Sequence, residues 1–489
     1  MLHTVSQKEI INRLHFDNPW WKTSDIEERY KNYPRRFYFD SFYQLTKELS
    51  INRAVVLMGP RRVGKTVMIY HTVDKLLSEG FPPKNVLYIS LETPVYTGLS
   101  LEKIVNIFIE EFDHDRDSQL FIVFDEIQYL VGWEVHLKSL VDSYPSYQFV
   151  ATGSAAAALK LKSKESGAGR FTDFLLPPLT FAEYLTFIGK VHDLITADNN
   201  LIKNYNTNNI DELNNEFINY LNYGGYPEAV FSELIQEESS RYIKSDIIDK
   251  VLLRDLPSLY GINDVQELNK LFTTIAYNTG NEINLESLSK DSGVSKNTIK
   301  KYLEYLEAAF LIKIVNRIDV NAKKFKRATS FKVYLTNPSM RAALFGPITA
   351  DHESMGMLTE TAIFSQWFHR ENIENNLHYA RWKKGEVDIV YLDNGKIKPT
   401  WSVEVKWSDL PCTDNRKLKG LIEFAKTNNL STVRVTTKTV FLKKEIDSVH
   451  VEFTPSSIYT YALGADMFEV KEATLRLEDI IRKDNATSW

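Results

Sequence analysis

Eight residues in the first part of the chain combine glycines, a lysine and a hydroxyl at a fixed spacing. Residues 59–66 have the sequence GPRRVGKT, which fits the phosphate-binding pattern G-x-x-x-x-G-K-[ST]. In this pattern Lys65 reaches the β- and γ-phosphates of a nucleotide, and Thr66 holds Mg²⁺. The stretch therefore predicts a site for ATP and Mg²⁺. The predicted nucleotide-binding residues are Gly59, Pro60, Arg61, Arg62, Val63, Gly64, Lys65 and Thr66.

The sequence on either side supplies the elements that this loop needs. Residues 54–58 form an apolar run typical of a buried parallel strand, and residues 67–78 have the pattern of a helix. A strand, a tight glycine loop and a helix amino terminus together point backbone N–H groups at phosphate oxygens. The alternative, an ordinary glycine-rich turn that opens a helix, is disfavoured by these flanks.

Two adjacent carboxylates end a later apolar strand, residues 120–126. An aspartate in this position binds Mg²⁺, and a glutamate polarises the attacking water, so Asp125 and Glu126 are the predicted catalytic carboxylates. This is the form of a Walker B segment. The alternative is an acidic turn at the end of a strand.

Strands and helices alternate through this region. Residues 85–91 and 147–152 are apolar strands, and residues 101–112 form a helix. Alternation of this kind predicts a parallel sheet with the nucleotide at the carboxyl ends of its strands. Thr152 and Ser154, at the end of one strand, are both candidates for a polar residue that senses the γ-phosphate.

The composition bounds the remaining possibilities. The 489 residues suffice for about three domains, and the net charge of −5 gives no overall basic field for nucleic acid. The one cysteine, Cys412, excludes an internal disulfide and a cysteine-rich zinc site, and it fits the cytoplasm. No run of 18 apolar residues occurs, so we expect neither a transmembrane helix nor a membrane partner.

Further motifs make a family resemblance specific. The loop at 59–66, DEIQ at 125–128, TGS at 152–154, GR at 169–170 and PLTFAEY at 178–184 resemble the AAA-type ATPases that carry a C-terminal domain of unknown function. The resemblance implies ATP hydrolysis.

In related ATPases an arginine near this point contacts the γ-phosphate of a neighbouring subunit. Arg170 is therefore the candidate for a catalytic arginine finger, and a second copy of the chain is an expected partner. The alternative is an ordinary arginine without phosphate contact.

A second glycine motif lies in the segment after the ATPase core. Residues 223–230, YGGYPEAV, interrupt a helical pattern. They are similar to the G-x-P signature in the lid of signalling-type NTPases, which implies that Gly225 allows close approach and that Pro227 packs on adenine. The alternative is a joint between two helices, because glycine and proline mark turns in any case.

The next segment has the pattern of a winged helix. We expect helices at 265–278 and 284–292, then a third helix capped by Ser295, and finally strands at 310–315 and 331–335. The stretch 284–330 holds ten lysines and arginines against five acidic residues, a local charge of +5. This is the local patch that DNA would require. The residues expected at DNA are Lys296, Asn297 and Lys300 in the major groove, and Lys323, Lys324, Lys326 and Arg327 on the wing. The alternative is a packing or nucleotide-sensing module.

Two carboxylates and a lysine meet in a predicted hairpin near the end of the chain. Asp388 lies in the strand 385–390, and Glu404 and Lys406 lie two residues apart in the strand 401–406, on one face. Asp388 and Glu404 would hold Mg²⁺, while Lys406 orients water or stabilises charge on phosphate.

This hairpin resembles the core of the PD-(D/E)XK nuclease superfamily, and Glu360 matches the helix glutamate that many members supply. A helix at 414–426 and a strand at 432–436 continue the expected order. The alternative is a hairpin with one solvated face.

The sequence thus predicts an α/β protein with four parts. These are a P-loop ATPase core (1–180), a helical lid (181–262), a winged helix (263–345) and a restriction-endonuclease-like α/β domain (346–489). We expect an ATPase that acts on DNA through the last two parts. A non-catalytic, ATP-dependent scaffold or sensor for a protein partner is the alternative function. A P-loop kinase is a third reading, which no acceptor-site motif supports.

Overall fold

The computed structural model of the protein describes residues 5–48, 51–153, 169–198, 204–325, 330–370, 373, 375–393, 395 and 398–466. The chain divides into two compact units, Met1–Leu176 and Pro177–Trp489. Among the described residues, no helix is long and apolar enough to cross a membrane.

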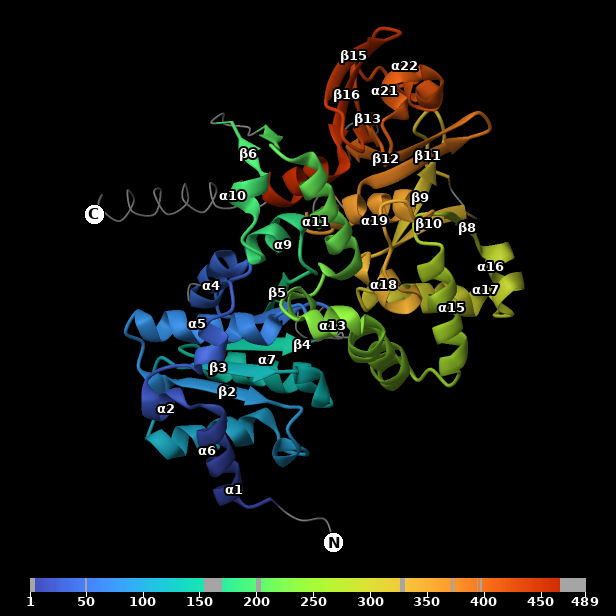
Figure 1. Ribbon diagram of the computed structural model, residues 1–489. Coiled ribbons are helices and arrows are strands. Elements are labelled where there is room, and N and C mark those ends of the chain that lie inside the picture. The colour runs from blue at the N-terminus through green and yellow to red at the C-terminus, as the bar shows by residue number, and fades with distance from the viewer. Residues whose placement is uncertain are drawn as a thin grey trace. The chain divides into compact units, whose positions relative to one another are not determined.

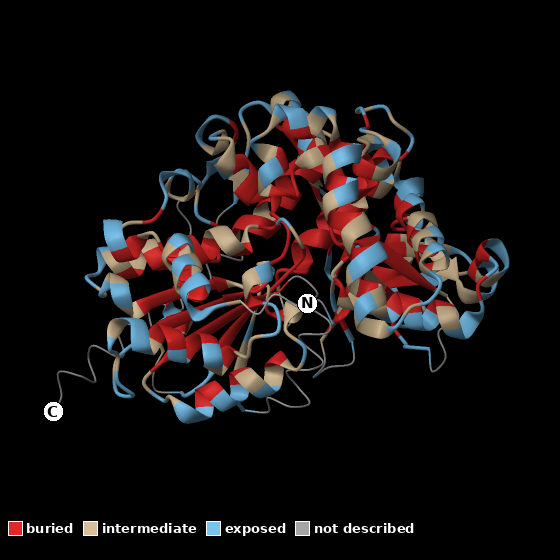
Figure 2. Cartoon of the chain, turned by 90° about the horizontal axis from the view of Figure 1, so that it is seen from below, coloured by how far each residue is buried: buried red, intermediate tan, exposed pale blue. Residues whose placement is uncertain are grey.

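The first unit is built on a five-stranded parallel sheet, as the alternating pattern predicted. Its strand order is β2-β3-β4-β1-β5. Strands β1 and β3 are buried along their whole length, and β4 is buried from its second residue onward, because both faces of the sheet are covered (Figure 2). The strands are β1 (Ala54–Met58), β2 (Val86–Ser90), β3 (Phe121–Asp125), β4 (Gln148–Gly153) and β5 (Phe171–Leu175).

Helices cover both faces of this sheet (Figure 1). The connection through α5 runs from the middle of the sheet to its edge, whereas those through α6 and α7 run back. Right-handed crossovers therefore place α5 on one face and the other two helices on the opposite face. The helices are α1 (Gln7–Asp17), α2 (Trp20–Thr23), α3 (Glu28–Lys31), α4 (Phe39–Lys47), α5 (Lys65–Ser78), α6 (Leu101–Phe112) and α7 (Trp133–Ser143), with 3-10 turns η1 (Pro83–Asn85), η2 (Pro94–Tyr96) and η3 (Ile127–Tyr129).

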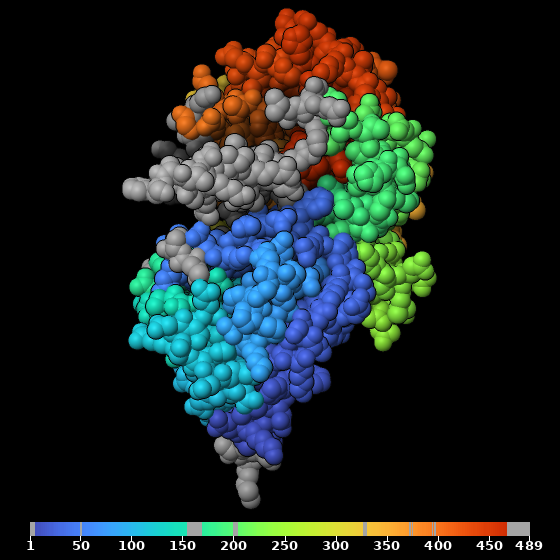
Figure 3. All heavy atoms as spheres, turned by 90° about the vertical axis from the view of Figure 1, so that its left-hand side faces the viewer, coloured from blue at the N-terminus to red at the C-terminus, as the bar shows by residue number. Residues whose placement is uncertain are grey.

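Residues before β1 protect the exposed edge of the sheet at β2. The side-chain amide of Asn18 accepts a hydrogen bond from the N–H of Tyr88 (2.6 Å) and donates to its carbonyl (3.0 Å). The indole N–H groups of Trp20 and Trp21 both donate to the carbonyl of Val86. Side chains thus take the place of a further strand. In the space-filling view these N-terminal residues lie beside the segment that follows β2 (Figure 3).

The strand order decides which side chains can meet at the carboxyl edge. Because β4 lies between β1 and β3, a residue at the end of β4 separates the loop after β1 from the carboxylates that end β3. Thr152 occupies this position. Ser154, the other predicted sensor, lies outside the described residues.

The second unit begins with helices, as predicted for residues 181–262. Thr180 and Glu183 form a capping box at the start of α9: each side chain accepts a hydrogen bond from the other residue's backbone N–H, at 3.0 and 3.1 Å. The threonine and glutamate of the PLTFAEY motif therefore begin a helix. The elements are α9 (Phe181–Phe187), α10 (Val191–Leu194), strands β6 (Thr196–Ala197) and β7 (Tyr205–Asn206), α11 (Ile210–Tyr223), α12 (Pro227–Val230), α13 (Glu233–Glu237), π-helical η4 (Ser240–Asp249) and η5 (Val251–Asp255), and α14 (Leu256–Tyr260).

A nine-stranded sheet forms the rest of the second unit, in the order β15-β16-β14-β13-β12-β11-β9-β10-β8. Strands β8, β9 and β10, from the predicted winged-helix segment, continue into the C-terminal strands through a parallel pairing of β9 with β11. The predicted boundary at 345/346 thus falls between parts that share one sheet. The strands are β8 (Glu282–Asn284), β9 (Ile312–Ile318), β10 (Ser330–Leu335), β11 (Leu377–Trp382), β12 (Gly385–Asp393), β13 (Lys398–Glu404), β14 (Thr432–Thr437), β15 (Leu442–Ile446) and β16 (Val449–Pro455).

Helices pack on both faces of this sheet. Apolar residues of α22, including Leu421 and Phe424, are buried against one face, and residues of α19, including Ile363 and Phe364, are buried against the other. The helices are α15 (Val265–Tyr277), α16 (Leu285–Ser292), α17 (Lys296–Ala308), α18 (Ser339–Phe345), α19 (Met355–Trp367), α21 (Leu410–Thr413), 3-10 helix η6 (Asn415–Leu418) and α22 (Lys419–Thr427). Ser295 caps α17 as predicted, accepting a hydrogen bond from the N–H of Thr298.

Candidate nucleotide site and carboxylate cluster

The phosphate-binding loop lies between β1 and α5, as its flanking sequence predicted. A side chain at Gly59 would place its Cβ 2.1 Å from the carbonyl oxygen of Leu176, so only glycine fits there. Gly64, in the left-handed region at φ 94°, precedes the first turn of α5. The ammonium group of Lys65 donates to the carbonyl oxygens of Gly59 and Pro60, at 3.0 and 2.8 Å.

Three hydroxyl groups converge on the carboxylate of Asp125. Thr66 at the start of α5 donates to Oδ2 at 3.0 Å, and Tyr88 of β2 donates to the same oxygen at 2.7 Å. Thr152 of β4 donates to Oδ1 and accepts a hydrogen bond from the N–H of Glu126. The structure thus brings the predicted loop and the predicted carboxylates together.

Burial and strain mark this end of β3. Burial and the neighbouring charge of Glu126 raise the pKa of Asp125, against the hydrogen bonds from Thr152, Tyr88 and Thr66. Glu126 has a left-handed backbone at φ 55°, which is uncommon for a residue with a side chain and frequent at functional sites.

Sequence reasoning missed two residues of this site. Tyr88 is the middle residue of the apolar strand β2, and its hydroxyl among apolar neighbours was the available signal. Arg36 is buried and donates to the carbonyl of Val63 at 2.6 Å, so the segment before β1 supports the loop.

Arg170 lies away from this chain's phosphate-binding loop. It precedes β5, in which Phe171 pairs with Ala54 at the amino end of β1, whereas the loop follows the carboxyl end of that strand. Its guanidinium forms an ion pair with Asp142. Contact between Arg170 and a γ-phosphate would therefore require a second copy of the chain.

Gly225 and Pro227 belong to the second unit. A Cβ at Gly225 would lie 2.2 Å from the side chain of Asn337. The backbone N–H of Gly225 donates to the hydroxyl of Ser339 at 3.2 Å. The close approach that this glycine permits is thus to Asn337. Pro227 is the first residue of α12, where its missing N–H costs no helical hydrogen bond.

The second unit gathers the predicted acidic residues and lysine. Ile389 pairs with Val403, so Asp388 and Glu404 lie next to each other on β12 and β13. The sequence predicted that Lys406 lies in the same strand as Glu404. Instead, β13 ends at Glu404, and Lys406 follows it. Its ammonium nevertheless reaches Glu404 at 2.7 Å and Asp388 at 3.4 Å.

A second lysine, which sequence reasoning did not assign, enters this cluster from β10. The ammonium of Lys332 lies 2.9 Å from Glu360 and 2.9 Å from Glu386, and 3.5 Å from Asp388. A lysine among the apolar residues of β10 was the one available signal. We call these six residues the carboxylate cluster: Lys332, Glu360, Glu386, Asp388, Glu404 and Lys406.

Burial and charge act in opposite directions in the carboxylate cluster. Burial, reinforced by Asp388, raises the pKa of Glu404 to about 8, and burial raises the pKa of Glu360 to about 7. Burial would also raise the pKa of Asp388, but the ammonium groups of Lys406 and Lys332 hold it below its ordinary value.

The donor set of the cluster fits one hard cation. Glu404 Oε2 is buried and has no hydrogen-bond partner among the described residues. It lies beside Asp388, and carboxylate oxygens are the ligands that Mg²⁺ prefers. Over the part of the chain that the structure describes, no three His, Cys, Asp or Glu side chains form a metal-binding group. Backbone oxygens or water would have to complete the coordination.

The basic residues of the predicted winged helix are exposed where the structure describes them. Lys296, Asn297 and Lys300 on α17 face solvent, as do Lys323 and Lys324. Lys296 forms an exposed ion pair with Glu286. The two remaining predicted wing residues, Lys326 and Arg327, lie outside the described residues.

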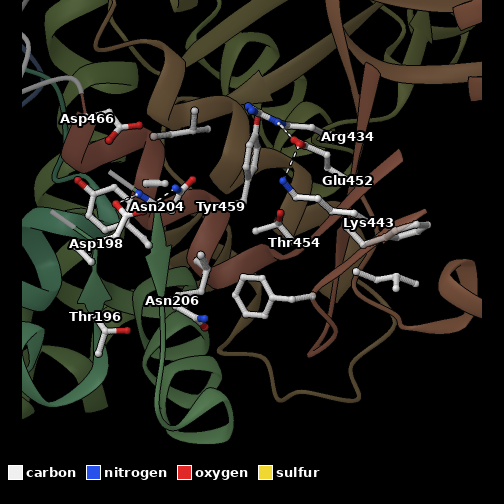
Figure 4. Close-up of a pocket in the computed structure, with 18 residues that line it drawn as sticks. Thr196, Asp198, Asn204, Asn206, Arg434, Lys443, Glu452, Thr454, Tyr459 and Asp466 are labelled. Atoms are coloured by element: carbon white, nitrogen blue, oxygen red, sulfur yellow. Dashed lines mark hydrogen bonds and ion pairs between the residues drawn. The ribbon is translucent and has the colours of Figure 1, made fainter. Parts of the chain in front are cut away.

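A hollow of about 870 Å³ lies elsewhere in the second unit, between the β6–β7 hairpin, strands β14 to β16 and the helix over 456–466 (Figure 4). Arg434 and Lys443 both pair there with Glu452, and Asn204 donates to Asp198. These polar groups are satisfied by one another, so they do not indicate a particular ligand.

Comparison with known proteins supports the interpretation of the first unit. Residues 51–185 match the family model of an AAA domain. Residues 214–351 match a domain of unknown function, DUF8612. This second match covers the predicted winged helix and only the first six residues, 346–351, of the predicted nuclease-like domain. The first unit thus has the sheet and the sequence motifs of an AAA-type P-loop domain.

Two relatives extend over more of the chain. An uncharacterized protein of Haemophilus influenzae is 27% identical over 304 residues, which are 61% of this chain and 70% of that protein. An uncharacterized protein of Methanocaldococcus jannaschii is 25% identical over 352 residues, 71% of this chain and 73% of that protein.

Solved structures resemble the chain only distantly. A Saccharomyces cerevisiae Hsp104–ADP complex has a TM-score of 0.30 at 12% identity, over 60% of this chain and 40% of that one. The replication initiator DnaA bound to AMPPCP and single-stranded DNA has a TM-score of 0.28 at 13% identity, over 55% and 86%. Likeness at this level carries no argument about function.

The raised pKa of Glu404 predicts a pH-dependent stability. Because folded Glu404 keeps its proton up to about pH 8, whereas an unfolded glutamate loses it near 4.5, the free energy of unfolding should fall as pH rises between these values. The fall is at most about 1.4 kcal/mol per pH unit for one proton. Urea unfolding in EDTA from pH 5 to 8.5 should show Glu404→Gln gaining stability relative to wild type as pH rises.

Glu452→Gln is the matched control, because its ion pairs lower the pKa of Glu452. It should show no such gain. Parallel pH profiles of the unfolding free energy for wild type and Glu404→Gln would contradict the raised pKa of Glu404.

Proposed function

We propose that the first unit binds ATP with Mg²⁺ and hydrolyses it. The observation that carries this proposal is the 3.0 Å hydrogen bond from Thr66 to Asp125. It puts the hydroxyl of the phosphate-binding loop on the carboxylate of the Walker B strand. These are the two protein groups that hold Mg²⁺ in nucleotide hydrolases of this class.

Each residue of the site has a role in this proposal. Lys65 exchanges the carbonyl oxygens of Gly59 and Pro60 for the β- and γ-phosphates, and N–H groups at the start of α5 bind phosphate oxygens. Glu126 orients the attacking water, and Thr152 holds the carboxylate of Asp125 and the backbone N–H of Glu126. Bound Mg²⁺ would neutralise charge on the β- and γ-phosphates.

Three further residues are proposed for nucleotide sensing. Arg170 would act on the γ-phosphate of a second copy, since its place in the sheet separates it from its own loop. Gly225 and Pro227 would form part of a lid, in which Pro227 contacts adenine. The half-buried position of Pro227 leaves its ring partly accessible.

ATP binding should depend on Lys65. Its ammonium would make two charge-assisted hydrogen bonds to phosphate, so Lys65→Ala should weaken ATP binding by about 100-fold or more. Isothermal titration calorimetry with Mg²⁺–ATP measures this. Lys75→Ala, which changes a partly exposed lysine in the last turn of the same helix, should bind ATP as wild type does. Equal affinity in Lys65→Ala and wild type would exclude the site.

We further propose metal-dependent hydrolysis of phosphodiesters at the carboxylate cluster. It is supported by the adjacency of Asp388 and Glu404, by Lys406 within 3.4 Å of both, and by the buried, unpaired Oε2 of Glu404. Asp388 and Glu404 would hold Mg²⁺, which activates water and polarises the phosphate when bound. Lys406 would stabilise negative charge on the scissile phosphate, and Glu360 would support the cluster from α19.

DNA is the proposed substrate because of the segment beside the cluster. Helix α15, strand β8, helices α16 and α17 and the β9–β10 hairpin follow the order of a winged helix. Its exposed Lys296, Asn297 and Lys300 would enter the major groove, and Lys323 and Lys324 would contact backbone phosphates.

Plasmid cleavage tests this second proposal. With Mn²⁺ or Mg²⁺ the wild type should nick or cut plasmid DNA, and Glu404→Gln should lower the rate by on the order of 100-fold or more through loss of a metal ligand. Glu452→Gln, a surface glutamate of β16, should leave the rate unchanged. Cleavage that persists in Glu404→Gln would place the activity elsewhere.

A further inference from the structure

Lys332 is an unusual member of the carboxylate cluster because it comes from the predicted winged-helix segment. Its strand, β10, is separated from β12 by β9 and β11, yet its ammonium contacts Glu386 and Asp388 of β12 and lies 5.3 Å from the centre of the Tyr379 ring. The side chain is only 4% exposed. A buried ammonium is retained only where several acceptors surround it.

The ammonium of Lys332 occupies a position that three carboxylates share. Glu360 comes from α19, and Glu386 and Asp388 come from β12, so the oxygens approach from two elements. Tyr334 also donates to Glu360, at 2.5 Å. In sites that use two metal ions, a second cation supplies positive charge beside the first. Here a lysine fills that place.

The charges of the cluster point to one remaining cation. Four carboxylates oppose two ammonium groups and the guanidinium of Arg381, which lies 3.6 Å from Glu386, so one negative charge remains when all are ionised. One oxygen of Asp388 faces Lys332, and the other faces Lys406 and the N–H of Val405. Glu404 Oε2 is buried and has no hydrogen-bond partner in the described part of the chain, so it is the point at which a divalent cation would enter.

We propose that Lys332 takes the place of a second metal ion in the carboxylate cluster, so that the site binds one divalent cation per chain, held by Asp388 and Glu404. This inference rests on the proposed phosphodiester hydrolysis at the same cluster. Lys332 is then a positioning residue: it fixes Asp388 and Glu360 and makes strand β10 part of the hydrolytic site.

Calorimetric titration of the full chain with Mn²⁺, without nucleotide, tests the stoichiometry. The wild type should bind one Mn²⁺ ion more than Glu404→Gln. Lys332→Met should bind a second ion, because three carboxylates lose their shared cation. Its melting temperature should rise with Mn²⁺ by more than that of wild type. Lys332→Arg, which keeps the charge, should bind one ion as wild type does.

Lys313→Met is the matched control, since Lys313 lies on the neighbouring strand β9 and pairs with Glu307, outside the carboxylate cluster. It should bind Mn²⁺ as wild type does. Two ions at the wild-type cluster, or one ion in folded Lys332→Met, would overturn the inference and leave the proposed hydrolysis standing. No ion lost in Glu404→Gln would overturn both. If Lys332→Met does not fold, the wild-type count still decides.

Discussion

The carboxylate of Asp125 is the point on which the first unit depends. Hydroxyl groups from the phosphate-binding loop, from β2 and from β4 all donate to it. They arrive from three elements that only a parallel sheet with β4 in the middle can bring together. A buried carboxylate without such donors would cost several kcal/mol. The hydrogen bonds therefore fix Asp125 at the end of β3.

In the second unit, ammonium groups stabilise buried carboxylates. Burial raises the pKa values of Glu404 and Glu360, and the neighbouring charge of Asp388 adds to this effect. The segment from α15 to β10 and the C-terminal strands share one sheet, and Lys332 of β10 joins the carboxylate cluster. In the proposed function, DNA held by the β9–β10 hairpin would thus contact the same sheet that carries the carboxylate cluster.

Local patterns carried much of the prediction. The loop at 59–66, the helix at 101–112 and the carboxylates Asp125 and Glu126 follow from motifs and apolar runs, which depend on neighbouring residues. Pairings between distant segments have no such signal. The parallel pairing of β9 with β11, and with it the approach of Lys332 to Asp388, depends on residues far apart in the chain. The contact between the Tyr88 hydroxyl and Asp125 could not be predicted for the same reason, since the two residues lie on different strands.

Turnover of ATP tests the central claim most directly. Steady-state hydrolysis should be measured with Mg²⁺, with and without plasmid DNA, for wild type and for Glu126→Gln. We predict turnover by wild type, and ATP binding without turnover by Glu126→Gln, because the substitution removes the base that orients water and leaves the phosphate contacts in place. Absence of turnover in wild type under both conditions would contradict the account and favour an ATP-dependent scaffold. Equal rates in the two proteins would remove Glu126 from the mechanism.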